Sequence, residues 1–159
     1  MSFESMLRGL NDAKIEFVVI GGLAAVAHGA PFVTNDLDVC YRASGENVDR
    51  LARLLRTWNA YPRGWEAGLP FELDSRTFHT TPLLTLQTAE GNLDLLDRVA
   101  GLDGYETAYE HSIEIEALGV SFRALELGAL IRAKEATGRA KDLGQLPALR
   151  ALLALMEES

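Results

Sequence analysis

Two closely spaced carboxylates are the first residues in this 159-residue chain whose types and spacing favour chemistry. Asp36 and Asp38 lie in a stretch that alternates polar and apolar side chains. On a strand both would point to the same side, with Cα atoms about 6.5 Å apart. Two such carboxylates repel each other unless a cation lies between them, and Mg²⁺ uses one or two carboxylates together with substrate phosphates. A solvated strand face is the commoner role of an isolated pair; the alternative is a metal site.

A third carboxylate, Asp94, lies between Leu93 and Leu95. If these leucines face the core, Asp94 points to the opposite face, where it would join Asp36 and Asp38. Metal ions held about 4 Å apart by such a set would clamp the attacking and leaving oxygens of a nucleotidyl transfer. Taken alone, Asp94 would be an edge-strand charge that discourages aggregation.

Two glycines, Gly21 and Gly22, end the apolar run Phe17–Ile20. A strand that ends in two glycines and opens a helix exposes backbone N–H groups at the positive helix end, which favours a phosphate. Glycine also lets the backbone approach the anion without a Cβ. A plain tight turn is the commoner role of such a pair. The chain has no P-loop and no G-x-G-x-x-G fingerprint, so the usual NTPase and dinucleotide-binding classes lose support.

Periodicity in the rest of the sequence indicates the elements that position these residues. The expected strands are 17–20, 36–42, a hairpin of 83–88 with 92–97, and a hairpin of 113–117 with 120–124. The expected helices are one ending before Asn11, 23–28, one after Ser44 as N-cap, 105–110, and two from Glu126 onward, separated by Gly138, with Pro147 in the first turn of the last. Residues 59–76 are expected to form a long surface loop. The pattern predicts an α+β domain with a five- or six-stranded mixed sheet, helices mainly on one face and a helical C-terminus.

Composition predicts one domain over residues 1–159, with a core at about 15–125 and C-terminal helices at about 126–158. Lys and Arg number 15 against 23 Asp and Glu, so the formal net charge is −8 and no stable non-specific binding of nucleic acid is expected. The single cysteine, Cys40, excludes a disulfide framework and indicates a reduced, cytoplasmic setting. The sequence predicts no membrane span and no signal peptide.

The glycines and the three carboxylates, in this order, resemble the DNA polymerase beta-like nucleotidyltransferase superfamily. They are most similar to a small branch grouped with bacterial abortive-infection nucleotidyltransferase toxins. That pattern has a strand, Gly-Gly with a following Ala and His-Gly, an Arg and a Thr before Asp-x-Asp, and later Gly-x-x-Asp-Leu-Leu. The matching residues are Gly21, Gly22, Ala24, His28, Gly29, Thr34, Asp36, Asp38 and Gly91 to Leu96 around Asp94. The C-terminal Lys134, Gly138, Arg139, Lys141 and Asp142 resemble the branch's Lys, Gly-Arg and Lys-Asp signature.

The resemblance implies transfer of a nucleoside monophosphate from an NTP to an unidentified hydroxyl acceptor: an RNA end such as that of tRNA, a protein or a small molecule. Asp36 and Asp38 would hold two Mg²⁺ ions, and Asp94 would complete one site and help deprotonate the acceptor. The residues expected to contact the nucleotide are Gly21, Gly22, Thr34, Lys134, Arg139 and Lys141. A place in a toxin–antitoxin or phage-defence system, with a cognate partner protein, is the biological role that the branch suggests.

Several alternatives stay open at this point. Lys134 continues the apolar stripe of its helix, so its ammonium group either reaches solvent or meets an anion. Asp142 is either the N-cap of the last helix or part of the site. Phe32 stands where the family has its Arg. This departure favours a rival function, a catalytically weak or inactive binding module, whereas the intact set of carboxylates favours the enzyme.

Overall fold

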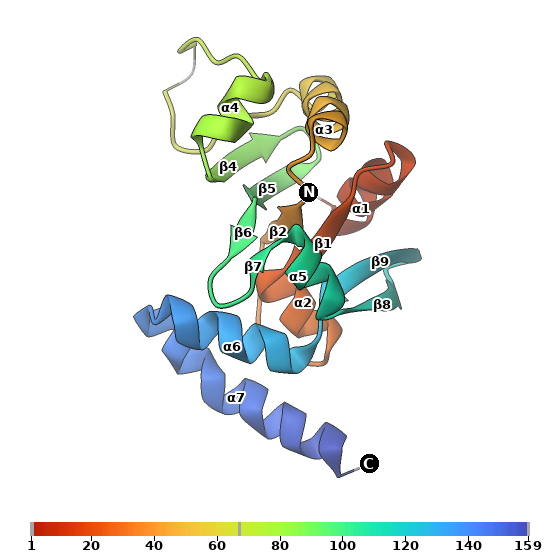
Figure 1. Cartoon of the computed structure of the whole chain (residues 1–159), viewed down its shortest axis with the longest axis vertical. Coiled ribbons are helices and arrows are strands. Elements are labelled where there is room, and N and C mark those ends of the chain that lie inside the picture. Colours follow the sequence, from red (N-terminus) through yellow and green to blue (C-terminus); the bar gives the residue numbers. More distant parts are fainter. Residues whose placement is uncertain (1, 67, 159) are drawn as a thin grey trace.

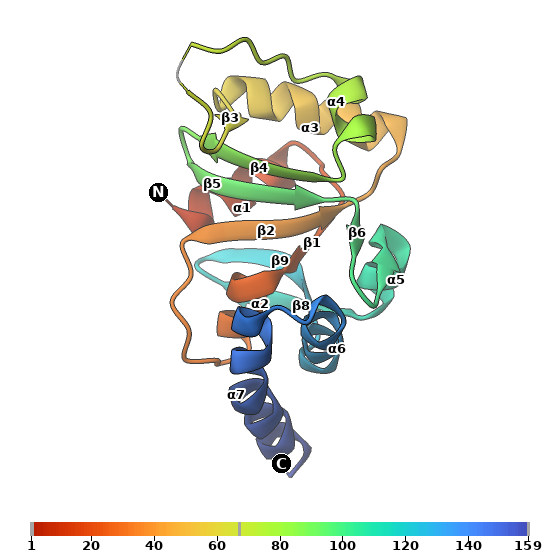
Figure 2. The same ribbon diagram turned by 90° about the vertical axis from the view of Figure 1, so that its left-hand side faces the viewer.

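A mixed sheet of seven strands forms the centre of the protein, in the order β3-β4-β5-β2-β1-β9-β8 (Figure 2). The computed structural model describes residues 2–66 and 68–158. The strands of the sheet are β1 (Phe17–Ile20), β2 (Asp36–Tyr41), β3 (Tyr61–Pro62), β4 (Leu83–Thr88), β5 (Gly91–Leu96), β8 (Ser112–Ala117) and β9 (Val120–Leu125). A separate ribbon pairs β6 (Arg98–Val99) with β7 (Asp103–Gly104). The predicted α+β class is therefore confirmed, and one strand more than expected is present.

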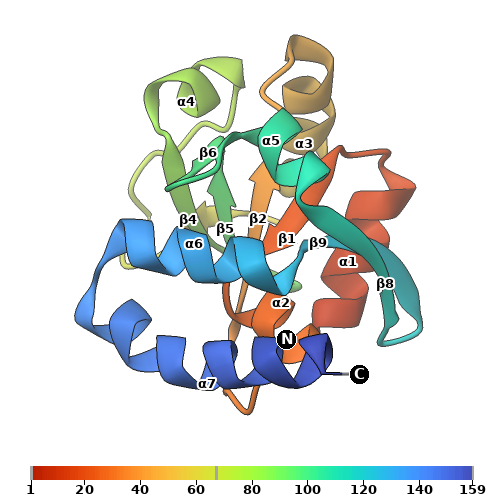
Figure 3. The same ribbon diagram turned by 60° about the horizontal axis from the view of Figure 1, so that its bottom comes forward.

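Helices cover both sides of the sheet, whereas the sequence predicted them mainly on one face. They are α1 (Phe3–Asp12), α2 (Gly21–Ala27), α3 (Gly45–Thr57), α4 (Ser75–Thr80), α5 (Tyr105–Glu110), α6 (Leu127–Thr137) and α7 (Ala140–Glu157). The first and third helices lie on one face, whereas α2 and the C-terminal pair lie on the other side (Figures 1 and 2). Figure 3 shows α6 and α7 side by side as a helical hairpin. Within the described residues, no helix combines the length and the apolar character needed to span a bilayer.

The register between β2 and β5 decides which side chains face the site. These strands are parallel, and their buried residues stand opposite each other, Leu37 beside Leu93 and Val39 beside Leu95. Each of the four is 0% exposed. Since side chains alternate along a strand, the residues between them must point to the other face of the sheet.

The helix ends follow local chemistry. Ser44 caps α3 as predicted, because its hydroxyl accepts a hydrogen bond from the Asn47 N–H at 3.3 Å. Gly138 ends α6 in the left-handed conformation, with φ of 67°, so the expected break between the two C-terminal helices is confirmed.

Two other expectations from the sequence are wrong in detail. Residues 59–76 are not all loop, since they contain the short strand β3 and the start of α4. Pro147 lies inside α7 rather than in its first turn, because the helix already begins at Ala140. The lost backbone hydrogen bond falls near Leu143, which is half exposed, so water can satisfy the free carbonyl.

Asn47 joins three segments and should be costly to replace. Its side chain accepts from the Glu16 N–H at 2.8 Å and donates to the carbonyls of Glu16 at 3.0 Å and Arg42 at 2.8 Å. The residue is 1% exposed, so Asn47→Ala would remove these partly buried bonds to Glu16 and Arg42, although the Glu16 carbonyl keeps its bond from the Arg42 N–H. We expect a loss of about 2–4 kcal/mol of unfolding free energy in urea titrations. The control is Asp49→Ala at an exposed position of α3; Asn59 is unsuitable as a control because it has a positive φ. An equal loss of unfolding free energy in Asn47→Ala and Asp49→Ala would contradict this role of Asn47.

Candidate active site

The structure brings Asp36, Asp38 and Asp94 to one face of the sheet. Asp38 and Asp94 are register partners on the parallel strands β2 and β5, which in a sheet run about 4.8 Å apart. Asp36 precedes Asp38 by two residues on the same strand and stands beside Asn92. The side-chain amide of Asn92 donates to Asp36 Oδ1 at 3.2 Å. The geometric convergence expected from the sequence is therefore observed.

Asp38 is the most perturbed carboxyl of this group. Burial raises its pKa from 3.8 to about 7, and the charge of Asp94, a hydrogen bond with Asp94 and the charge of Asp36 act in the same direction. Arg63 opposes the shift. Oδ1 of Asp38 is buried and has no hydrogen-bond partner among the described residues. The site thus concentrates negative charge that its own residues do not fully neutralise.

Arg63 is a site residue that sequence reasoning missed. It follows β3, and its guanidinium Nη2 donates to Asp94 Oδ1 in a largely buried ion pair. A second nitrogen, Nη1, donates to the Leu86 carbonyl at 3.1 Å, and the Arg63 backbone N–H donates to the Thr85 carbonyl at 2.8 Å. Only the pairing of β3 with β4 brings this arginine to the carboxylates, and no local motif marks it.

The carboxylates fit a divalent cation, although they do not form a closed cage. Among residues 2–66 and 68–158, no three His, Cys, Asp or Glu side chains stand in a ready-made metal arrangement. Arg63 holds Asp94 and Asn92 holds Asp36, which explains why the set is open. The donors are all oxygens, and one buried oxygen of Asp38 is unpartnered, which is the chemistry that Mg²⁺ prefers when substrate phosphates supply its other ligands.

The two glycines pack directly against this group. Gly21 has φ of 67°, and a Cβ built on it would lie 2.2 Å from Asp38 Oδ2. A Cβ on Gly22 would lie 2.7 Å from Thr34 Oγ1. Thr34 in turn donates to the Asp36 carbonyl at 3.3 Å. The turn between β1 and α2 therefore lies in contact with the carboxylates, and only glycine fits there.

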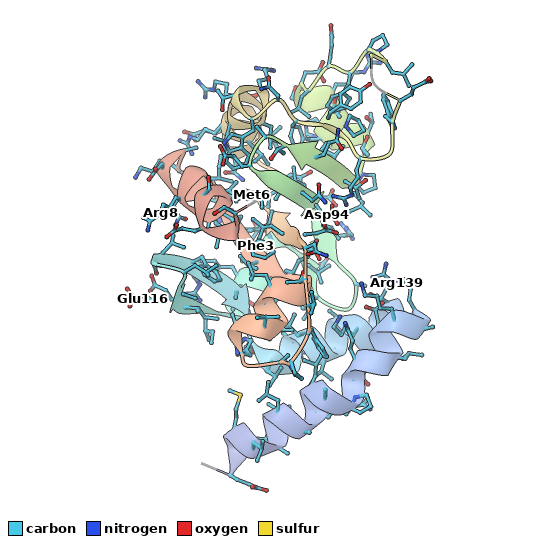
Figure 4. The ribbon with its side chains drawn as sticks, turned by 180° about the vertical axis from the view of Figure 1, so that it is seen from behind. Phe3, Met6, Arg8, Asp94, Glu116 and Arg139 are labelled. Atoms are coloured by element: carbon cyan, nitrogen blue, oxygen red, sulfur yellow. The ribbon has the colours of Figure 1, made fainter. Side chains whose placement is uncertain are left out.

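The three C-terminal cations are placed differently from one another. Lys134 Nζ lies 3.4 Å from Asp142 Oδ1 and its side chain is 12% exposed, so of the two alternatives it meets an anion. Arg139 Nε lies 2.8 Å from Asp142 Oδ2. The hydrogen bond to Asp142 is the main reason that the pKa of Arg139 is raised. The negative charges of Asp142 and Asp38 act in the same direction. Arg139 lies on the same flank of the molecule as Asp94 (Figure 4). Lys141 is exposed in the first turn of α7.

Asp142 is not the N-cap of the last helix; Arg139 occupies that position. The Asp142 carboxylate is buried between α6 and α7. Burial alone would raise its pKa, but the hydrogen bond from Arg139 and the charge of Lys134 outweigh it, so the pKa of Asp142 is lowered. Asp142 therefore ties the helical hairpin together.

The remaining candidates have structural roles. His28 Nε2 lies 2.8 Å from the Leu125 carbonyl, a hydrogen bond that anchors α2 to β9. Cys40 is buried rather than exposed on the carboxylate face, and burial raises its pKa to about 12, so its thiol is unreactive. Phe32 packs against the core.

Comparison with known proteins identifies the fold. No family model matches the chain, and no curated protein has a significantly similar sequence. Among solved structures, the lincosamide antibiotic adenylyltransferase LnuA with lincomycin bound is 14% identical over 96% of this chain and 98% of its own, with a TM-score of 0.62. ANT(2'')-Ia in complex with adenylyl-2''-tobramycin is 14% identical over 96% and 87% of the two chains, with a TM-score of 0.59. A candidate nucleotidyltransferase of Thermotoga maritima is 15% identical over 100% and 97%, with a TM-score of 0.51.

These similarities show that the chain has the nucleotidyltransferase fold along nearly its whole length. The fold expected from the glycines and carboxylates is confirmed. The closer likeness to the abortive-infection branch stays a prediction.

Proposed function

We propose that this protein is a metal-dependent nucleotidyltransferase that moves a nucleoside monophosphate from an NTP to the hydroxyl group of an acceptor. The observation that carries the proposal is the contact between the Gly21 turn and Asp38, with Asp94 as the register partner of Asp38. A fold alone does not specify chemistry. A glycine turn packed against the carboxylates does favour chemistry on a triphosphate.

The reaction forms one bond to phosphorus, breaks another, and moves one proton. The acceptor oxygen attacks the α-phosphorus of the NTP, its proton passes to Asp94, and the bond from the α-phosphorus to the β-bridging oxygen breaks, releasing pyrophosphate. Asp36 and Asp38 would hold two Mg²⁺ ions, and Asp94 would share one of them. When bound, Mg²⁺ supplies positive charge to the phosphates and to the reacting oxygens.

The polypeptide itself contributes position and charge. The backbone of Gly21 and Gly22, with the hydroxyl of Thr34, would hold phosphate oxygens close to the carboxylates. Arg139 is the C-terminal cation best placed to add charge, since Asp38 already influences it. Lys134 and Lys141 are proposed to add further charge, although Asp142 engages both Lys134 and Arg139.

A second candidate function is a binding module that has lost catalysis, acting with a cognate partner protein in a toxin–antitoxin or phage-defence pair. The specific observation in its favour is Arg63, which neutralises Asp94 with a resident cation. Phe32 in place of the family Arg points the same way. If Arg63 replaces the metal permanently, nucleotide binding will not depend on Mg²⁺.

Metal dependence of NTP binding separates the two functions. Calorimetric titration of ATP, CTP, GTP and UTP should show at least one nucleotide that binds tenfold or more tightly with Mg²⁺ than with EDTA, because unneutralised carboxylates repel a triphosphate. The double variant Asp36→Asn/Asp38→Asn should lose that difference, whereas Asp49→Asn on the exposed surface of α3 should keep it.

Transfer itself is measured with α-labelled NTP and Mg²⁺ against total RNA, protein and small-molecule fractions of a cell extract. We expect label in one fraction from the wild type and none from the double variant. Equal NTP affinity with and without metal would favour the binding module. Label transfer that persists in the double variant would show that Asp36 and Asp38 do not carry the chemistry, which would then lie elsewhere on the chain or in a contaminant.

A further inference from the structure

A cavity of about 480 Å³ adjoins the carboxylates and is not used by the function proposed above. It lies between one end of β4, helix α4 and the segment after β3, at the top of Figure 1. Its walls include Arg63, Trp65, Phe71, Thr77, Leu83 and Thr85. A volume of a few hundred Å³ is typical of small-molecule sites and too small for a folded partner.

The cavity exists because the edge of the sheet is only partly covered. The strand β3 has two residues and pairs with Leu86 and Gln87 of β4. Beyond this pairing the chain turns away, after Arg63 donates its N–H to the Thr85 carbonyl. On the edge of β4 that faces away from β5, the half of the strand that starts at Leu83 is therefore bordered by the cavity instead of by another strand.

Side-chain hydrogen bonds fix the outer wall in place. The Tyr61 hydroxyl donates to the Leu69 carbonyl at 2.7 Å, and Arg56 Nη2 donates to the Leu73 carbonyl at 2.7 Å. The rings of Tyr61, Trp65 and Phe71 meet edge to face, with centroids 6.0 to 6.2 Å apart. A wall tied at both ends and packed on aromatic rings is preformed, as ligand sites usually are.

Two wall residues connect the cavity to Asp94. Thr85 is the register partner of Asp94 on the antiparallel strand, so both side chains point to the same face of the sheet. Arg63 lines the cavity and bonds Asp94 with the same guanidinium group. A hydroxyl held in the cavity at this end would thus lie within one side-chain length of the proposed base.

The chemistry of the walls indicates what would bind. Trp65 is 50% exposed and Leu83 is 50% exposed, so flat and apolar surface is available. The rim carries Arg63 and Arg76 together with Glu72 and Asp74, and Arg63 is already paired with Asp94. The rim therefore has no excess of positive charge, which favours a neutral ligand over a polyanion such as RNA.

We propose that this cavity binds the acceptor, and that the acceptor is a small neutral molecule with a hydroxyl group and a flat apolar face. The inference rests on the proposed function. The hydroxyl passes Arg63 to reach Asp94, which takes its proton while the oxygen forms its bond to the α-phosphorus and pyrophosphate leaves. Arg63 acts as a positioning residue that orients Asp94 at the mouth of the cavity.

Binding is tested first with 2-phenylethanol, a probe that carries one flat ring and one hydroxyl. Titration followed by NMR should give a saturable shift of the Trp65 indole N–H, without NTP or metal. Leu83→Arg should lower the affinity for the probe at least tenfold, because it places a charge in the cavity. Trp65→Ala should also lower this affinity, without adding a charge. Leu118→Arg is the matched control: Leu118 is 49% exposed in the β8–β9 turn at the opposite edge of the sheet, so binding should stay unchanged.

The second arm distinguishes failure of the inference from failure of the proposed function. In the labelled extract we expect transfer to the small-molecule fraction, reduced tenfold or more in Leu83→Arg and unchanged in Leu118→Arg, while Leu83→Arg still binds NTP with Mg²⁺. No saturable probe binding, equal binding by Leu83→Arg, or label in RNA or protein that does not depend on Leu83 would overturn the cavity assignment alone. Absence of metal-dependent NTP binding in the wild type would overturn the proposed function itself.

Discussion

Asp38→Asn is expected to stabilise the fold and, at the same time, to reduce nucleotide transfer strongly. The wild-type carboxyl has a pKa of about 7 in the fold against 3.8 for its ordinary value, with burial as the largest cause and Asp94 next. At pH 8 the charge is present and unfavourable in the folded state, and asparagine removes it while keeping the shape. A shift of this size corresponds to about 2–4 kcal/mol of unfolding free energy gained by the variant.

The pH dependence gives the sign of the effect. Because the folded pKa is raised, the folded wild type holds a proton between about pH 4 and pH 7 that the unfolded chain has already lost. Its unfolding free energy therefore falls as pH rises through this window. Asp38→Asn lacks this slope, so the two proteins should differ little at pH 4 and most at pH 8. Urea titrations at pH 4, 6 and 8 measure the difference, with the exposed Asp49→Asn as control.

Activity should change in the opposite direction. Loss of one charged metal ligand is expected to reduce transfer about a hundredfold or more, since the metal accounts for several kcal/mol of transition-state stabilisation. A variant that is more stable but inactive would show that the charged Asp38 lowers the stability of the fold and is nevertheless required for transfer. Equal stability of variant and wild type at pH 8 would show that neither burial nor the charges of Asp94 and Asp36 disfavour the Asp38 carboxylate in the fold.

The local parts of the site were predictable from the sequence. The alternation of Leu37 and Val39 with Asp36 and Asp38 is a period of two, and it requires one face to be polar. The same alternation holds around Asp94, and the turn before it marks a hairpin. Each inference needs only a few consecutive residues, and the structure agrees with both.

The contacts between distant segments were not predictable in the same way. Arg63 reaches Asp94 because a two-residue strand, β3, adds to the edge of the sheet, and so short a strand has no periodicity. Similarly, the sequence left Asp142 as either the N-cap of the last helix or part of the site, whereas the structure places it in the first turn of α7, bonded to Lys134 of the preceding helix. A single sequence gives residue types and their spacing along the chain. It does not reveal which loop packs against which strand in the fold.

Cys40 shows a further limit of the alternation rule. Its position predicts the same face as Asp36 and Asp38, yet it is 0% exposed. Beyond Val39 both sides of β2 are covered, with Tyr41 also buried. A half-buried strand can become fully buried along its length, and polarity alternates only where one face meets the site or the solvent.

The tight contact between Gly21 and Asp38 leads to the second large expected effect, which concerns Gly21→Ala. The φ of 67° is unfavourable for alanine, and the added Cβ would lie 2.2 Å from Asp38 Oδ2, so the carboxylate would have to move. We expect unfolding free energy to fall by about 2–4 kcal/mol. The displaced Asp38 should also remove metal-dependent NTP binding, measured by calorimetry on protein that is still folded at low temperature.

Gly144→Ala in α7 is the matched control, because a Cβ there meets nothing within 4 Å and alanine favours a helix interior. It should raise stability by about 0.5–1 kcal/mol and leave NTP binding intact. Opposite signs for the same chemical change would show that Gly21 is required by its contact with Asp38 and not by its small size in general. If Gly21→Ala instead kept both its stability and its metal-dependent affinity, the glycine turn would not lie against the carboxylates, and the phosphate position proposed for it would be wrong.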